Sequence, residues 1–165
     1  MGDGKGGIFC EDSLELPNNW NNKTQQSIRL NSFDCLLANP PFGKDIKIKG
    51  KEKLAQYKLA KKWKKEGNVF VETNKANTEM PPQILFIERC LELLTDGGRM
   101  GIIIPETYFH APRAQYVMDF MAKHNIFCLL DLPHNTFRPH NNAKCIAIFL
   151  EKNRPQQKHI LMCVA

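Results

Sequence analysis

The sequence predicts an α/β domain with a mostly parallel sheet that ends in a C-terminal antiparallel hairpin. Two observations support this fold class. Apolar runs alternate with segments of helical periodicity along the chain, and several runs are continuous, as in parallel strands that are buried on both faces. A length of 165 residues, of which 42% are hydrophobic and 24% charged, is typical of one globular domain.

Five strands and two helices are expected. Residues 81–98 should form the first helix, because they have prolines in the first turn, an apolar stripe at helical spacing and a Gly-Gly stop. The second helix covers about 114–124. Residues 133–144 leave no room for a helix, so only the last two strands should be antiparallel. The expected strands are residues 6–12 (GGIFCED), 33–41 (FDCLLANPP), 99–109 (RMGIIIPETYF), 126–133 (IFCLLDLP) and 145–153 (CIAIFLEKN).

The net charge of +6 is concentrated in one segment, because residues 44–65 carry ten lysines. This segment is either a solvated surface helix or mobile loop, or a nonspecific contact for nucleic acid phosphates. The candidates for phosphate contact are Lys44, Lys47, Lys49, Lys51 and, further along the chain, Arg138.

The composition indicates a soluble, cytoplasmic protein without a structural metal. No run approaches the ~18 apolar residues of a membrane span, and no segment has the pattern of an export signal. The cysteines form no C-x-x-C pair and lie mostly in apolar runs, as buried thiols do in a reducing compartment. They are Cys10, Cys35, Cys90, Cys128, Cys145 and Cys163.

The stretch that follows the second expected strand carries the strongest chemical signal. Ligands of open α/β sheets gather beyond the carboxyl ends of the strands, and Asn39 to Phe42 (NPPF) stand at such an end. The Asn39 amide can accept and donate hydrogen bonds, while Pro40 and Pro41 fix φ and leave rigid carbonyls. Phe42 adds a flat aromatic face. This arrangement suits a planar amino group of a base or amide.

These four residues resemble the Asn/Asp-Pro-Pro-aromatic motif of the amino-group DNA methyltransferases that use S-adenosylmethionine, and most closely of type I restriction modification subunits. Residues 81–109 resemble the helix and strand that follow the motif, and residues 129–153 resemble the closing hairpin. The resemblance covers nearly the whole chain. It implies a truncated Rossmann-like methyltransferase sheet and methyl transfer to the N6 amine of adenine.

The resemblance also implies roles for individual residues. Asn39 and the Pro40 carbonyl would hold the target amine, and Phe42 and Phe137 would stack on a flipped-out base. The implied partners are double-stranded DNA and the specificity and restriction subunits. The residues implied in binding S-adenosylmethionine are Asp12, which would end the strand 6–12 and receive the cofactor's adenine amine, with Ser13, Leu14 and Asn39.

Residues 1–165 are therefore expected to be a partial catalytic domain that lacks the family's cofactor loop and target-recognition domain. Residues 33–152 should form a four-stranded sheet in which strand 33–41 has one open edge. Residues 1–16 should be detached, mispaired or docked in a vacated position. Two alternatives stay open: another amine or amide methyltransferase, acting on protein glutamine or RNA bases, and a nucleic-acid-binding module without activity.

Overall fold

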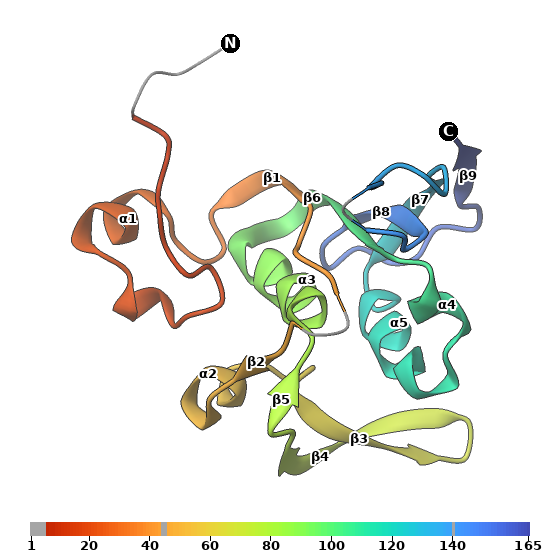
Figure 1. Ribbon diagram of the computed structural model, residues 1–165, viewed down its shortest axis with the longest axis horizontal. Coiled ribbons are helices and arrows are strands. Elements are labelled where there is room, and N and C mark those ends of the chain that lie inside the picture. Colours follow the sequence, from red (N-terminus) through yellow and green to blue (C-terminus); the bar gives the residue numbers. More distant parts are fainter. Residues whose placement is uncertain (1–5, 44–45, 140) are drawn as a thin grey trace.

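The computed structural model describes residues 6–43, 46–139 and 141–165. Their core is a five-stranded sheet, flanked by helices and by a protruding hairpin (Figure 1). Along the sheet the strand order is β1-β6-β8-β7-β9. The strands are β1 (Phe33–Ala38), β6 (Leu94–Pro105), β7 (Asn125–Asp131), β8 (Cys145–Glu151) and β9 (Leu161–Val164).

The predicted fold class is confirmed, with a correction to the strand pairing. Four strands run in one direction, since β1 pairs with β6 in parallel and β7 pairs with β9 in parallel. The hairpin β7–β8 is antiparallel as expected, but β8 lies between β7 and β6 and is antiparallel to both. The expectation of one antiparallel pair was therefore wrong. A hairpin strand that inserts between two parallel strands opposes each of them.

The expected strand at residues 6–12 is absent, because residues 6–11 are irregular backbone or bends. The segment that follows packs against α2 (Lys51–Ala55) and α3 (Pro82–Leu93), where the Leu14 carbonyl accepts a hydrogen bond of 3.0 Å from the Tyr57 hydroxyl. Strand β1 keeps one edge without a partner among the described residues, as expected. The four strands expected within residues 33–152 are present, and β9, which lies after them in the chain, adds a fifth strand to the sheet.

Helix α3 forms the main contact with the sheet and follows the predicted pattern. It begins after Pro81 with Pro82 in its first turn, and it buries Ile84, Leu85 and Ile87 among the apolar residues of the core. The helix ends at Leu93, four residues before the predicted glycine stop, because β6 starts directly at Leu94. Gly101 of β6 is tightly enclosed: a Cβ there would lie 2.7 Å from Leu37 Cδ2.

The basic segment is neither one surface helix nor a loop. Its described part contains β2 (Ile48–Lys49), helix α2 and strand β3 (Lys61–Glu66), which pairs with β4 (Val69–Ala76) in an antiparallel hairpin. Gly67 and Asn68 form the two-residue connection, with Gly67 at φ +62°. Strand β2 pairs with β5 (Glu79–Met80). In Figure 1 the hairpin lies beside α4 and α5.

The remaining elements are short. In the part of the chain that the structure describes, no helix is long and apolar enough to cross a bilayer. The elements are η1 (Pro17–Asn19), α1 (Asn22–Ser27), α4 (Thr107–His110), η2 (Pro112–Ala114) and α5 (Gln115–Met121), the last of which matches the second predicted helix.

Candidate active site

The Asn-Pro-Pro-Phe turn begins directly after β1, at the carboxyl end of the strand. The Asn39 side chain is exposed and forms no hydrogen bond with another described residue. Pro40 is buried and anchors the turn, while Pro41 is exposed. The Pro40 carbonyl likewise accepts no hydrogen bond from the described residues. An amide oxygen and a backbone carbonyl are thus available at one strand end.

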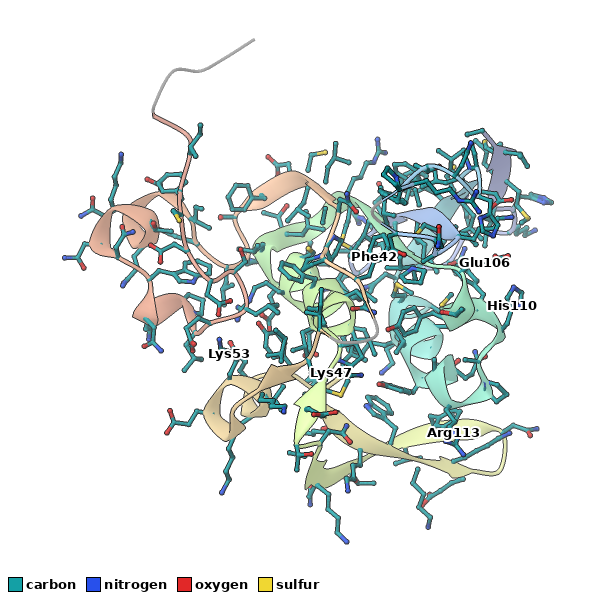
Figure 2. All side chains as sticks on the ribbon, viewed as in Figure 1. Phe42, Lys47, Lys53, Glu106, His110 and Arg113 are labelled. Carbon is teal, nitrogen blue, oxygen red and sulfur yellow. The ribbon has the colours of Figure 1, made fainter. Side chains whose placement is uncertain are left out.

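The hairpin loop between β7 and β8 folds over this turn. The Phe42 and Phe137 rings meet edge to face, with their centroids 5.3 Å apart and an interplanar angle of 86°. Edge-to-face contact is one of the two preferred geometries of an aromatic pair. The structure therefore brings together the two aromatic residues that were predicted to contact the base. Figure 2 shows Phe42 at about the level of Glu106, the residue that follows β6.

Asn141 is a residue of this site that sequence reasoning missed. Its Nδ2 donates to the Phe42 carbonyl (3.1 Å), and its Oδ1 accepts from the Ala143 N–H (2.8 Å). Its own N–H donates to the Phe137 carbonyl (2.9 Å). Asn141 thus ties the loop to the turn. The sequence signal for this role is the asparagine pair after Phe137. Asparagine side chains in a short loop often form hydrogen bonds with neighbouring backbone groups.

The residues expected to bind the cofactor lie in a different environment. The Asp12 carboxylate accepts from the Leu14 N–H (3.0 Å) and pairs with Lys53 Nζ at 2.6 Å. Ser13 is exposed and Leu14 is buried in the core. No hydrogen bond or ion pair between described residues joins this turn to Asn39. Asp12, Ser13 and Leu14 are consecutive in the chain, and their link to Asn39 stays a prediction.

Because of the Asp12–Lys53 ion pair, we expect the free energy of unfolding to depend on pH. Burial acts to raise the Asp12 pKa, but hydrogen bonds from Lys53 and the Leu14 N–H outweigh it and hold the pKa below its ordinary value. A depressed carboxyl pKa stabilises the fold above the unfolded pKa of about 4, and this stability is lost as the pH falls through the folded pKa. The pair is half-exposed, so the effect should stay below about 1 kcal/mol.

The measurement is urea unfolding of the wild type and of Lys53→Met at about pH 6 and about pH 3. The advantage of the wild type should shrink at the lower pH. Glu15 acts in the same direction, because the Leu16 N–H and then Lys53, at 3.1 Å, lower its pKa as well. A difference between the two proteins that stays constant with pH would contradict the assignment.

The candidate phosphate contacts differ in their surroundings. Lys49 lies 3.7 Å from Glu79 in an exposed ion pair, whereas Lys47 and Lys51 are exposed and pair with no described residue. Arg138 is exposed in the β7–β8 loop, next to Phe137. Lys44 lies outside the described residues.

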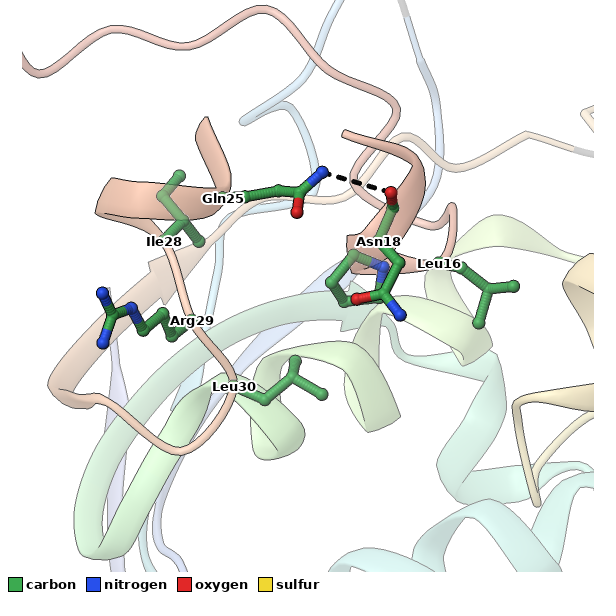
Figure 3. A pocket seen from close by; sticks show the side chains of 7 residues that line it. Leu16, Asn18, Gln25, Ile28, Arg29 and Leu30 are labelled. Atoms are coloured by element: carbon green, nitrogen blue, oxygen red, sulfur yellow. Dashed lines mark hydrogen bonds between the residues drawn. The ribbon is translucent and has the colours of Figure 1, made fainter. Parts of the chain in front are cut away.

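A separate hollow of about 350 Å³ lies between η1 and α1. Figure 3 shows its lining, in which the Gln25 amide donates to the Asn18 carbonyl at 3.1 Å. The hollow is lined by residues 16–30 only, and none of the predicted site residues contributes to it. It is therefore a feature of the N-terminal segment and not of the Asn39 turn.

Comparisons with known proteins agree with the fold. The chain is similar to a protein from Listeria monocytogenes assigned to the class I S-adenosylmethionine-dependent methyltransferases (TM-score 0.56, 19% identity, 79% of this chain and 36% of that chain). It is also similar to a modification subunit assigned to a type I restriction enzyme of Vibrio vulnificus YJ016 (TM-score 0.57, 18% identity, 88% and 27%). The chain thus spans about a third of these proteins or less. No curated protein matches it in sequence.

The sheet, with one reversed strand and a strand-end turn that carries exposed polar groups, defines a chain of the class I methyltransferase fold. The family model of the N-6 DNA methylases matches residues 3–165. The chain belongs to the N-6 DNA methylase family.

Proposed function

We propose that this chain is part of the catalytic domain of an enzyme that transfers a methyl group from S-adenosylmethionine to the N6 amine of adenine in DNA. The observation that carries the proposal is the Asn39 turn. It presents an exposed amide and the Pro40 carbonyl beside an aromatic pair, at the carboxyl end of β1. Membership of the N-6 DNA methylase family supports the reaction type.

The acceptor chemistry follows from these groups. The lone pair of an adenine amine is delocalised into the ring, so the planar amine is a poor nucleophile. Acceptance of its two hydrogens by the Asn39 Oδ1 and the Pro40 carbonyl favours a pyramidal amine. The same two oxygens stabilise the positive charge that develops on the nitrogen. No side-chain nucleophile is required.

The aromatic residues hold the base in this arrangement. Extruding a base from the duplex costs a few kcal/mol, and stacking against an aromatic face recovers part of that cost. Phe42 follows the prolines directly, and Phe137 reaches it from the β7–β8 loop. For a base to lie between the two rings, the loop has to open, because the ring centroids are 5.3 Å apart.

The described residues do not form a complete binding site for the methyl donor. S-adenosylmethionine would supply the methyl group on its sulfonium, and Asp12, Ser13, Leu14 and Asn39 are the proposed contacts. The Asp12 carboxylate accepts from Lys53 and the Leu14 N–H, but its side chain is 56% exposed and keeps acceptor capacity for the cofactor's adenine amine. We assign no step to this side of the site.

The wider assignments belong to the same proposal. Residues 1–165 form a partial methyltransferase domain, and the protein acts in the cytoplasm within a restriction-modification system. Its partners are double-stranded DNA and the specificity and restriction subunits. The residues assigned to backbone phosphates are Lys44, Lys47, Lys49, Lys51 and Arg138.

The test is a methylation assay with radiolabelled S-adenosylmethionine on DNA, RNA and a glutamine-containing protein. Label should enter DNA and should appear as N6-methyladenine after digestion to nucleosides. Label in RNA or protein, with none in DNA, would replace the proposal by the corresponding amine or amide methyltransferase.

A binding module without activity is the second candidate, and one observation favours it. The Asp12 carboxylate, the expected adenine contact of the cofactor, is paired with Lys53, so the cofactor has to compete with this ion pair. Calorimetric titration with S-adenosylmethionine separates the two candidates. Heat of saturable binding supports the enzyme, whereas DNA binding without any cofactor binding supports the module.

A further inference from the structure

The hairpin β3–β4 and the segment from α4 to α5 enclose two neighbouring hollows, which we call the hairpin trough. The larger one, of about 490 Å³, is lined on its polar side by Lys61, Lys62 and Arg113. The smaller one, of about 260 Å³, includes Lys65 and His110. Ala111 lines both.

The trough is cationic. Among the described residues, no carboxylate lines either hollow. Lys61 is neutralised by an ion pair with Glu72. Lys62, Lys65 and Arg113, in contrast, form no ion pair with another described residue, so their charges remain available to an anion.

The walls of the trough are aromatic. Trp63 stacks on Tyr116, with ring centroids 5.5 Å apart and an interplanar angle of 23°, and Phe70 lies 6.4 Å from the same tyrosine. Burial raises the pKa of Tyr108 and of Tyr116 to about 12, so both phenols are neutral at pH 7. The Trp63 indole N–H is buried without an acceptor among the described residues. An unpaired donor of this kind calls for a water or a ligand oxygen.

The trough starts at the same edge of the sheet as the Asn39 turn. Helix α4 begins two residues after Pro105, the last residue of β6, and β6 is the neighbour of β1. Figure 2 shows Glu106, His110 and Arg113 descending in order from the level of Phe42 to the hairpin. A strand that leaves the turn in this direction passes over the trough.

We propose that the hairpin trough binds the DNA strand that flanks the base held at Asn39. Lys62, Lys65 and Arg113 contact its phosphates, and the Trp63–Tyr116 wall contacts an unstacked base. Basic grooves with aromatic platforms are the usual means of holding single-stranded nucleic acid. The inference rests on the proposed function and extends it, because it places DNA binding on a hairpin outside the Asn-Pro-Pro-Phe turn.

The first test measures the affinity of a fluorescein-labelled single-stranded DNA by anisotropy at several salt concentrations. Lys62→Gln with Arg113→Gln should weaken binding about tenfold, and should reduce the slope of log K against log salt by about 1.4. The matched control is Lys23→Gln with Arg29→Gln, which removes the same charge from exposed residues in and just after α1. The control should change both quantities little.

The second test uses the fluorescence of Trp63. The chain has two tryptophans, so Trp20→Phe leaves Trp63 as the single emitter. Single-stranded DNA should quench this emission, and inorganic polyphosphate, which has no bases, should not. An acidic peptide would bind the same lysines but would also leave the emission unchanged.

The outcomes distinguish the trough assignment from the proposed methyltransferase function. If both double variants lose affinity equally, and DNA does not quench Trp63, the trough is not the site, while methylation at Asn39 stands. If the wild-type protein binds a DNA duplex but not the single-stranded probe, only the trough assignment fails, and if it binds neither, the trough assignment and the proposed function both fail. Loss of affinity confined to the Lys62/Arg113 variant, together with quenching, supports the trough.

Discussion

Asn39→Ala should lower kcat for DNA methylation by at least about 100-fold and leave the affinity for DNA nearly unchanged. The reason is that the lost amide acts on the reacting amine, whereas DNA affinity comes mainly from contacts with the phosphates. The side chain is exposed and bonds to no described residue, so its removal should not unfold the protein. The measurements are single-turnover methylation and DNA anisotropy.

Asn39→Asp is the matched variant for this prediction. It keeps an acceptor oxygen but has no N–H₂ group, so it should retain more activity than Asn39→Ala if acceptance of the amine hydrogens is the catalytic role. Retention of a tenth or more of the wild-type kcat by Asn39→Ala would remove this residue from the reaction.

Arg89→Ala should destabilise the fold by about 3–5 kcal/mol. The Arg89 side chain is 2% exposed, and its guanidinium donates to the Tyr57 hydroxyl (3.0 Å), to Glu92 (2.9 Å) and to the Glu15 carbonyl (3.1 Å). It therefore joins α3 to the N-terminal segment and to the residues after α2. Its loss leaves one buried and two partly buried acceptors without this donor, which costs more than the bonds themselves contribute.

The matched control is Arg99→Ala. Arg99 also pairs with a carboxylate, Glu151, at 3.1 Å, but its side chain is 68% exposed. This change should cost less than about 1 kcal/mol, because water replaces an exposed partner. Urea unfolding of the two variants measures the difference. Equal losses in the two variants would show that the Arg89 network does not hold the N-terminal segment.

The central sheet was predictable because its signals are local. Continuous apolar runs identified β1, β6, β7 and β8, and prolines marked the start of α3. The strand expected at residues 6–12 failed for a non-local reason: a strand forms only where a neighbour satisfies its backbone, and these residues pair with no strand of the described sheet. The position of β8 between β6 and β7 was likewise hidden, because sequence order does not give spatial order.

The hairpin β3–β4 carried a readable signal that the lysine content masked. A Gly-Asn pair separates β3 from Val69, Phe70 and Val71, and such a pair between residues of high β-propensity is typical of a hairpin turn. Of the candidate site, the motif and its aromatic partner Phe137 were found from sequence. The link made by Asn141 was not, because it depends on how the β7–β8 loop folds back.

The unpaired edge of β1 has a mechanical consequence for the turn that follows it. Among the described residues, strand β1 is bonded to β6 on one side only, so the strand that leads to Asn39 has fewer ladder hydrogen bonds to hold it than an interior strand. The stiffness of the turn then depends on Pro40, Pro41 and the bond from Asn141 to the Phe42 carbonyl. Any polypeptide that adds to this edge would stiffen the position of Asn39 without touching it, and would thereby couple assembly to the alignment of the reacting amine.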